Sequence, residues 1–166
     1  EGSGCFPMSS SGLASGNHGV EATCHALCEL IERDAVTLRH QIASQALGSR
    51  PASAAGRRID LDSIDDEACR ELLARYRDAA VEVAVWDATS EIGVPVFECA
   101  ILNAESATRG DGGVAAGGSG CHLAPAIALV RALTEAAQSR VTMIAGARDD
   151  LDRDAYARWR DPAHLA

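Results

Sequence analysis

The feature that most constrains the fold is a pair of long helical segments that enclose β-rich sequence. Residues 20–45 and 125–146 carry apolar side chains at the spacing of an amphipathic helix. Between them, residues 81–87 and 94–102 are rich in β-branched side chains and are separated by a turn-like stretch at residues 89–93. So short a connection predicts antiparallel pairing, because parallel strands need a crossover of about a dozen residues or more. We therefore predict an α/β (α+β) fold in which long helices pack on a mainly antiparallel sheet.

Shorter segments complete the predicted order of elements. Residues 64–80 have apolar side chains at helical intervals and predict a surface helix, and residues 152–159 predict one more short helix. Residues 48–58 contain Gly, Pro and Ser and predict a connector. Residues 105–120 are glycine-rich and predict a long loop, which in a compact domain is usually functional or disordered.

The composition is typical of one globular domain. The chain has 166 residues, of which 47% are hydrophobic and only 4% aromatic, so its core must consist mainly of Ala, Val, Leu and Ile. No stretch approaches the roughly 20 apolar residues of a membrane span, and residues 1–5 lack the start of a signal peptide. We therefore expect no membrane association, a cytoplasmic location and reduced thiols for the six cysteines.

The charge of the chain excludes some classes of function. A formal net charge of −9 argues against a nucleic-acid-binding surface, which would carry a basic patch. The chain contains no Lys, so a phosphate-binding Lys of the P-loop kind is impossible. Any direct contact with a phosphate must come from Arg, from backbone N–H groups or through a metal ion.

Glu29 and Glu32 form a candidate metal site on the first long helix. Residues three apart lie on one helix face, and two like charges there are mildly destabilising unless a cation lies between them. Mg²⁺ prefers oxygen ligands and would satisfy such a pair. The alternative is a solvent-exposed polar face, and for an isolated E-x-x-E pattern this is the more frequent outcome.

Glu135 and Gln138 repeat this spacing on the second long helix. Arg131 lies four residues before Glu135 and could form an ion pair with it. An exposed polar face is again the alternative, although the surrounding Ala residues indicate close packing nearby. If the two helices converge, their oxygen-bearing side chains could share metal ions.

A Ser- and Gly-rich loop at residues 9–17 precedes the first helix. Backbone N–H groups at a helix N-terminus favour anions, and Gly12 and Gly16 would let the backbone approach a phosphate closely. A flexible leader is an equally good interpretation of this loop. Asn17 or a neighbouring residue is expected to cap the helix, with Glu21 in its first turn.

A zinc site is a weaker hypothesis for the same helix. It would use Cys24, His25, Cys28 and His122, whose side chains are all possible zinc ligands. Only one half of a paired Cys spacing is present, so small buried side chains on an Ala-rich helix are the favoured interpretation.

Three ordered motifs resemble the YcaO family. They are SSGLASGN at residues 10–17 with CELIERD at 28–34, DATSEIGVPVF at 87–97, and GSGCH at 118–122 with ALVRALTEAAQSR at 128–140. Three motifs in order are far more specific than any one of them. Residues 145–150 also resemble a subgroup that is often paired with TfuA-like proteins.

The resemblance implies a chemistry. Members of this family bind ATP and Mg²⁺ and activate a peptide amide by phosphorylating its oxygen. Attack by a Cys, Ser or Thr side chain then gives an azoline, and attack by a sulfide source gives a thioamide, in a ribosomally made peptide or protein. The implied partners are that peptide or protein substrate and a TfuA-like or precursor-binding protein, and a homodimer is possible.

The resemblance also assigns residues by position. Ligands of Mg²⁺ and ATP would be Glu29, Glu32, Glu135 and Gln138. Ser11 and Gly12 would lie near the nucleotide. The side chains that contact phosphate or hold the carboxylates in place would be Arg33, Arg131 and Arg140. No residue is implied as a nucleophile, because the chemistry needs mainly positioning and charge neutralisation.

The resemblance spans about residues 9–150, whereas domains of the family are longer at both ends. We therefore expect residues 1–166 to form a single partial domain, the central fragment of a longer protein. A non-catalytic scaffold that docks a peptide or a partner protein is the alternative function, and the retained acidic residues argue for the enzyme.

Overall fold

The computed structural model describes residues 10–46, 57–103 and 115–145. Its elements, in chain order, are α1 (Gly19–Ala46), β1 (Arg57–Arg58), the 3₁₀ turn η2 (Leu61–Ser63), α2 (Glu67–Asp78), β2 (Val81–Asp87), β3 (Val96–Asn103), β4 (Ala116–Cys121) and α4 (Pro125–Ala145).

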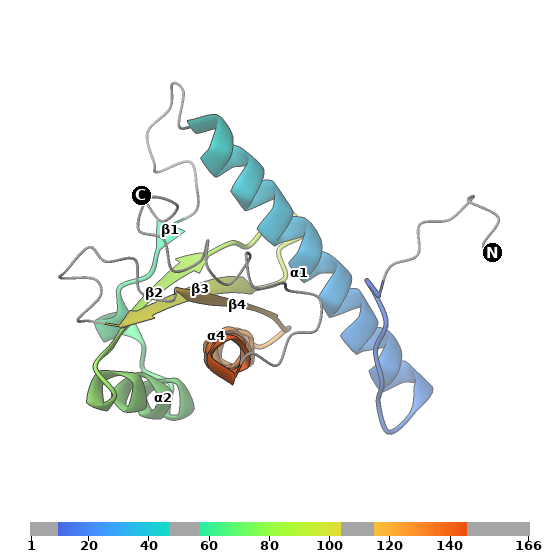
Figure 1. Ribbon diagram of the computed structural model, residues 1–166. Coiled ribbons are helices and arrows are strands. Elements are labelled where there is room, and N and C mark those ends of the chain that lie inside the picture. The colour runs from blue at the N-terminus through green and yellow to red at the C-terminus, as the bar shows by residue number, and fades with distance from the viewer. Residues whose placement is uncertain (1–9, 47–56, 104–114, 146–166) are drawn as a thin grey trace.

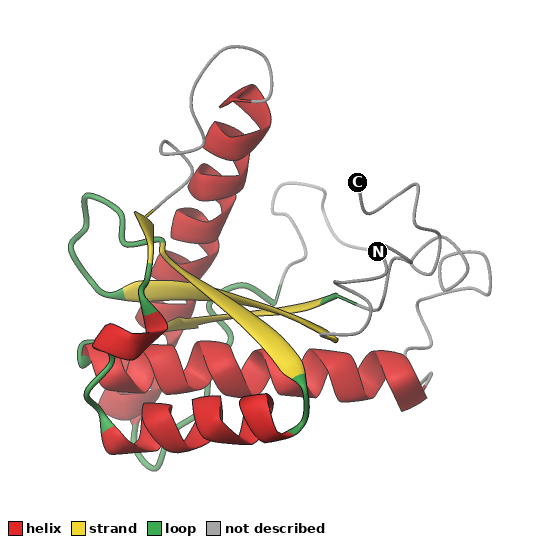
Figure 2. Cartoon of the chain, turned by 90° about the vertical axis from the view of Figure 1, so that its left-hand side faces the viewer, coloured by secondary structure: helices red, strands yellow, loops and turns green. Residues whose placement is uncertain are grey.

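The four strands form one sheet in the order β1-β2-β3-β4, and every pairing is antiparallel. Helices α2 and α4 lie side by side under one face of this sheet, whereas α1 crosses the other face over β3 and β4 (Figures 1 and 2). The predicted fold class is thereby confirmed.

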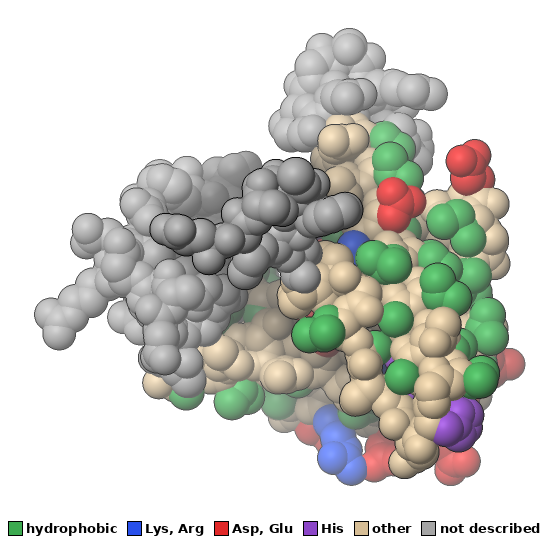
Figure 3. Space-filling view, turned by 90° about the vertical axis from the view of Figure 1, so that its right-hand side faces the viewer, with side chains coloured by type: hydrophobic (Ala, Val, Ile, Leu, Met, Phe, Trp, Pro, Cys, Tyr) green, Lys and Arg blue, Asp and Glu red, His purple; other side chains and the backbone are tan. Residues whose placement is uncertain are grey.

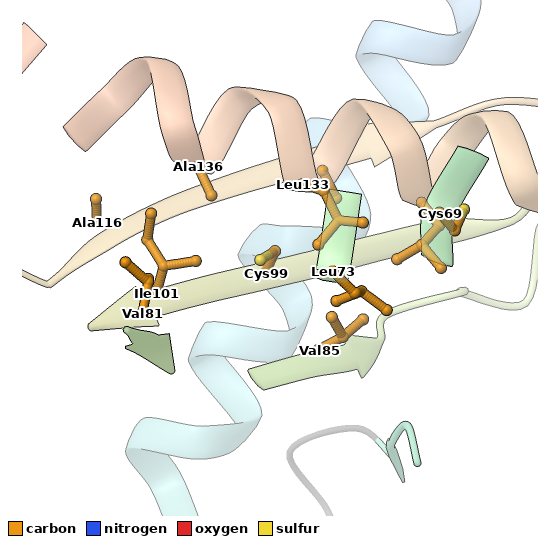
Figure 4. Close-up of a cluster of buried hydrophobic side chains, with 11 residues drawn as sticks. Cys69, Leu73, Val81, Val85, Cys99, Ile101, Ala116, Leu133 and Ala136 are labelled. Atoms are coloured by element: carbon orange, nitrogen blue, oxygen red, sulfur yellow. The ribbon is translucent and has the colours of Figure 1, made fainter. Parts of the chain in front are cut away.

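The alternation of side chains along β3 shows why helices cover both faces. Cys99 and Ile101 point into the hydrophobic cluster beneath α4, whereas Val96 belongs to the cluster beneath α1. Because side chains of a strand point alternately to the two faces, a strand with apolar residues on both must be covered twice. Figure 4 shows the larger cluster, in which Leu133 of α4 and Leu73 of α2 meet Val85 of the sheet.

Local hydrogen bonds explain where α1 and α2 begin and how α2 is held against α4. The carboxylate of Glu21 accepts from the Asn17 backbone N–H at 2.7 Å, and the His18 ring accepts from the Glu21 N–H at 3.3 Å. His18, the neighbour of Asn17, thus acts as the capping side chain of α1. In α2, Asp66 caps the helix by accepting from the Cys69 N–H at 3.0 Å, and the Tyr76 hydroxyl donates to the Leu133 carbonyl of α4 at 2.6 Å.

A cluster of polar side chains attaches the second half of α1 to the sheet. The Arg39 guanidinium stacks over the ring of Trp86, 4.7 Å from its centroid, and donates to the carboxylate of Glu98. The ring of His40 lies 2.8 Å from the other oxygen of Glu98. Hydrophobic side chains are exposed on this side of the molecule (Figure 3). Leu27 and Ile42 of α1 are among the exposed large apolar residues.

The prediction of a loop over residues 105–120 is wrong for its last part, which forms strand β4. Residues 116–120 belong to this strand, although it contains Gly117, Gly118 and Gly120 and therefore lacks the usual β-branched pattern. A Cβ at Gly118 would collide with the backbone of α4 at Ala132 and Ala136. Gly118 and Gly120 are thus required by the close approach of helix and strand, which no pattern within the strand itself indicates.

The other predicted elements compare as follows. The helices at 20–45 and 125–146 and the strands at 81–87 and 94–102 are confirmed with small shifts of their ends. The helix expected at 64–80 begins only at Glu67. The connector prediction is wrong at residues 57–58, which pair with β2 as β1. The remainder of that connector, residues 105–114 and the helix expected at 152–159 lie outside the described residues. Among the helices of the described ranges, none is long and apolar enough to cross a membrane.

Substitution of Gly118 by Ala tests the packing of α4 on β4. We expect G118A to lower the free energy of unfolding by about 1–3 kcal/mol or more, because the added methyl group forces the helix away from the strand. The matched control is G117A on the opposite face of the same strand, where a Cβ would lie 3.6 Å from the nearest carbonyl oxygen, that of Cys99. G117A should change the stability by less than about 0.5 kcal/mol in urea denaturation. Equal stabilities of the two variants would contradict this account.

Candidate functional site

Two carboxylates from different helices meet at Ser119 on strand β4. The Ser119 hydroxyl donates to Oε1 of Glu32, on α1, at 2.7 Å. The Ser119 backbone N–H donates to Oε2 of Glu135, on α4, at 2.7 Å, and the hydroxyl oxygen lies 3.4 Å from the same Oε2. The structure therefore brings together one predicted ligand from each long helix.

The position of β4 in the sheet explains this meeting. Strand β4 is the last strand in the order, so the N–H groups on its outer side have no neighbouring strand among the described residues. The Ser119 N–H points to this side and is satisfied by Glu135 instead. The Ser119 side chain points to the face that α1 covers, and there it meets Glu32. One residue at a sheet edge can thus contact both helices.

The environment of Glu32 disfavours its charged form. Burial raises the pKa of Glu32 above its ordinary value, and the nearby charge of Glu135 raises it further. The Ser119 hydroxyl, the Arg131 guanidinium and the Cys121 N–H lower that pKa but do not reverse the shift. Two facing carboxylates with so little compensation form a site where a cation would be favourable.

Arg131 lies beside this acidic pair. Its NH1 donates to the Cys121 carbonyl at 3.2 Å, at the end of β4. Among the ion pairs of the described residues, none joins Arg131 to Glu135, whose carboxylate instead accepts from the Ser119 N–H. Arg131 is therefore placed to hold the end of β4, and its positive charge partly offsets the negative charge of Glu32 and Glu135.

Glu29 has a different environment from Glu32, although both were predicted as metal ligands. Its Oε2 accepts from the Gly12 N–H, and its Oε1 accepts from Nε of Arg33 at 2.8 Å. The Gly12 N–H and, to a smaller extent, Arg33 lower the pKa of Glu29 below its ordinary value. Gly12 has a φ of +77°, a conformation that glycine adopts without strain. Glu29 thus ties the Ser- and Gly-rich loop to α1.

The remaining predicted residues divide into two groups. Gln138 and Glu135 line an open hollow of about 490 Å³ between α4 and the start of β4, and Ser11 lies exposed in the turn beside Gly12. Arg140 points away from the acidic pair and donates to Oδ1 of Asn103, at the far end of β3. The structure therefore does not bring Arg140 to the other predicted residues.

The zinc hypothesis finds no support in the described parts of the chain. No group of three or more His, Cys, Asp or Glu side chains there could hold a metal ion. His25 approaches the Ser15 carbonyl at 3.1 Å and His122 accepts from the Ala124 N–H at 3.0 Å, so the two rings have other partners. Cys28 is buried in the cluster beneath α1, as small apolar side chains are.

Ser119 was absent from the predicted site. It stands between two glycines in the GSGCH segment, and the resemblance assigned it no role. Its contacts depend on the sheet edge and on two helices far away in sequence. The only available signal was a polar side chain in a segment otherwise made of small residues.

The residues present fit a magnesium ion. Glu32 and Glu135 offer carboxylate oxygens, and Ser119 and Gln138 add neutral oxygens nearby. Hard divalent cations prefer such ligands, and Mg²⁺ typically uses one or two carboxylates together with phosphate oxygens and water. The hollow beside Glu135 leaves space for further ligands.

Comparison with known proteins agrees with this chemistry. The model of the family described as YcaO cyclodehydratase, ATP- and Mg²⁺-binding, matches residues 1–166. A protein of Rhizobium leguminosarum bv. trifolii, described as an uncharacterized protein in the tfuA 3' region, is 42% identical over 155 residues, which are 92% of this chain and 35% of that protein.

Two solved structures share the fold. A heterocyclase in complex with substrate and cofactor has a TM-score of 0.69 and 28% identity, over 92% of this chain and 18% of that one. YcaO from Methanopyrus kandleri, bound with AMPPCP and Mg²⁺, has a TM-score of 0.59 and 17% identity, over 97% of this chain and 37% of that one. At that identity the second likeness shows the fold alone.

The chain belongs to the YcaO family. It spans about a third of the length of the relatives that it matches.

The tether between Glu29 and Gly12 predicts a pH dependence. The pKa of Glu29 is lowered in the folded protein, so its stabilising contribution is present above the ordinary value of 4.5 and is lost as the pH falls through the lower folded value. The Gly12 amide proton, followed by NMR of ¹⁵N-labelled protein, should therefore titrate below pH 4.5. In an E29Q variant this titration should disappear. A Gly12 titration at or above the ordinary Glu value would contradict the tether.

Glu32 should have the opposite effect on stability. Because its pKa is raised, folding disfavours the ionised form, and stability falls as the pH rises from the ordinary value through the raised one. We therefore expect E32Q to have a higher Tm than the wild type at neutral pH with a chelator present, and the two to converge at acidic pH. E71Q, which removes an exposed carboxylate paired with Arg75, is the control and should not gain stability. A lower Tm for E32Q at neutral pH would refute this description of the pair.

Proposed function

We propose that this chain forms the core of an ATP- and Mg²⁺-dependent enzyme that activates a peptide backbone amide by phosphorylating its oxygen. The product is an azoline or a thioamide in a ribosomally made peptide or protein. Membership of the YcaO family supports the reaction class. The similar heterocyclase, solved with substrate and cofactor, supports a cyclodehydratase-type role.

The observation that carries the proposal is the meeting of Glu32 and Glu135 at Ser119. Two carboxylates held together at the edge of a sheet, beside an open hollow, form a site for a divalent cation and the phosphates bound to it. This chain contains no Lys, so within it the contacts with phosphate would come from metal, Arg or backbone N–H groups.

In this proposal the residues of the chain bind and orient, and none acts as a nucleophile. Mg²⁺ supplies neutralisation of phosphate charge, and Glu32, Glu135 and Gln138 would hold it. The amide oxygen of the substrate takes the γ-phosphoryl group of ATP, with release of ADP. That oxygen later departs as inorganic phosphate when the sulfur or oxygen nucleophile has formed its bond to the amide carbon. Such a reaction depends mainly on alignment and charge stabilisation.

Glu29 would act on the nucleotide indirectly, through the loop that it holds. It holds the loop that contains Ser11 and Gly12 against α1, one helical turn from Glu32. The loop would then present its backbone to the nucleotide, while Arg33 fixes the carboxylate of Glu29 at 2.8 Å. Arg140 is not part of this proposal, because it lies against Asn103.

The partner is proposed from the Rhizobium relative. Its description places it in the tfuA 3' region, which supports a TfuA-like protein as the partner of this chain's parent and a thioamide as its product. A precursor-binding partner would instead favour an azoline. The homodimer and the cytoplasmic location stay predictions.

Replacement of the two carboxylates tests the proposed function. In the full-length parent protein, E32Q and E135Q should each weaken binding of Mg²⁺ with a non-hydrolysable ATP analogue by about tenfold or more, because each removes a charged ligand. Isothermal titration calorimetry gives the affinity. E71Q makes the same chemical change on the exposed surface of α2 and should leave the affinity unchanged.

Three outcomes are decisive. Unchanged affinity in both E32Q and E135Q would refute the site. Lost affinity together with ATP turnover by the wild type in the presence of its peptide would support the enzyme. Retained nucleotide binding without turnover under those conditions would instead favour the scaffold that docks a peptide or a partner.

A further inference from the structure

We propose that Ser119 is a positioning residue, which holds Glu32 and Glu135 together as one cation site before any cation binds. The proposal rests on the proposed function only for the identity of the cation. It extends that function by assigning a role to a residue that contacts both carboxylates.

Ser119 supplies one hydrogen-bond donor to each carboxylate. A serine hydroxyl has a single proton, and the distance of 2.7 Å to Glu32, against 3.4 Å to Glu135, assigns that proton to Glu32. Glu135 receives the backbone N–H of the same residue at 2.7 Å. The carboxylates of Glu32 and Glu135, which repel each other, are thus held close together by two donors of the same residue, the hydroxyl and the backbone N–H of Ser119. Hydrogen bonds to charged groups are stronger than those between neutral groups, so each donor can hold its carboxylate.

The backbone of Ser119 is itself held in place. On either side, Gly118 and Gly120 lie so close to α4 that a Cβ at either position would meet helix backbone atoms. Strand β3 pairs with β4 along its inner side, with Glu98 opposite Ser119. The strand therefore cannot shift without breaking its contacts with both α4 and β3. A serine at this position serves as a fixed reference point for side chains from the two helices.

The hydroxyl matters most for Glu32. Glu135 comes from α4, which the glycine contacts already fix on β4. Near this point, in the described part of the chain, helix α1 packs on the sheet mainly through the apolar cluster of Cys28 and Ala35, and its polar attachment at Arg39 lies about two turns further along. Without the hydroxyl, the carboxylate of Glu32 would lose its shortest hydrogen bond while it still faced the charge of Glu135. It would then turn away and leave the cation with one carboxylate.

The prediction is a loss of metal affinity in S119A that S119T largely restores. Groups that orient metal ligands typically contribute about 10–100-fold to affinity, and we expect a loss in this range for S119A. Thr retains the hydroxyl and should remain within about threefold of the wild type, which is at the low end of the effect of losing one neutral hydrogen bond. S63A is the matched control, since the Ser63 hydroxyl donates to the Asp60 carbonyl, in a turn away from the site.

The measurement uses Mn²⁺ as the probe, without nucleotide, in the full-length parent protein. Free Mn²⁺ is counted by electron paramagnetic resonance, and the Tm of each variant confirms that it is folded. A double-mutant cycle with E32Q then separates positioning from a merely structural role. If Ser119 acts through Glu32, S119A should cause little further loss in the E32Q background.

The outcomes distinguish this inference from the proposed function. Wild-type Mn²⁺ affinity in S119A, or an equal loss from S119A with and without Glu32, would overturn the positioning role. Failure of the full-length protein to turn over ATP would refute the enzyme but would leave the Mn²⁺ results, and hence the role of Ser119, intact.

Discussion

The close packing of α4 on strand β4 is the contact on which the rest of the structure depends. Gly118 and Gly120 let the helix backbone reach the strand, and α4 presents Ala128, Ala132 and Ala136, all fully buried, at the same interface. A larger side chain on either surface would separate them. The closeness also has a chemical consequence, since it allows Glu135 to reach around the edge of the sheet to the Ser119 N–H.

The second helix reaches this edge by a different route. Helix α1 crosses the opposite face of the sheet and is attached by apolar packing and by the contact of Arg39 with Trp86 and Glu98. This attachment places Glu32 partly out of water and opposite Glu135, where burial and the neighbouring charge raise its pKa. The fold thus holds a destabilising charge in place. Such an arrangement is typical of sites where a ligand, rather than the protein itself, satisfies the charge.

Local patterns predicted most of the fold but little of the site's geometry. The long helices and the strands at 81–87 and 94–102 follow from a repeat of 3.6 or 2 residues, which depends only on nearby sequence. Strand β4 was missed because Gly118 and Gly120 are needed for its packing against α4, a helix that comes later in the chain. The convergence of the two helices, and hence Ser119, could not be derived, because it depends on which strand lies at the edge of the sheet.

The structure also separates residues that the sequence presented as equivalent. The E-x-x-E and E-x-x-Q patterns suggested four similar ligands, but the two residues of the first pattern have different surroundings in the structure. Glu29 already accepts from the Gly12 N–H and pairs with Arg33, and both contacts lower its pKa. Glu32, one turn further along, has Arg131 nearby, but burial and the charge of Glu135 outweigh it and raise the pKa of Glu32. The first carboxylate of the motif therefore ties the loop to α1, and the second meets Glu135 at Ser119. The spacing of three residues places these two contacts one turn apart, so that under the proposed function the loop and the acidic pair would act on the same nucleotide.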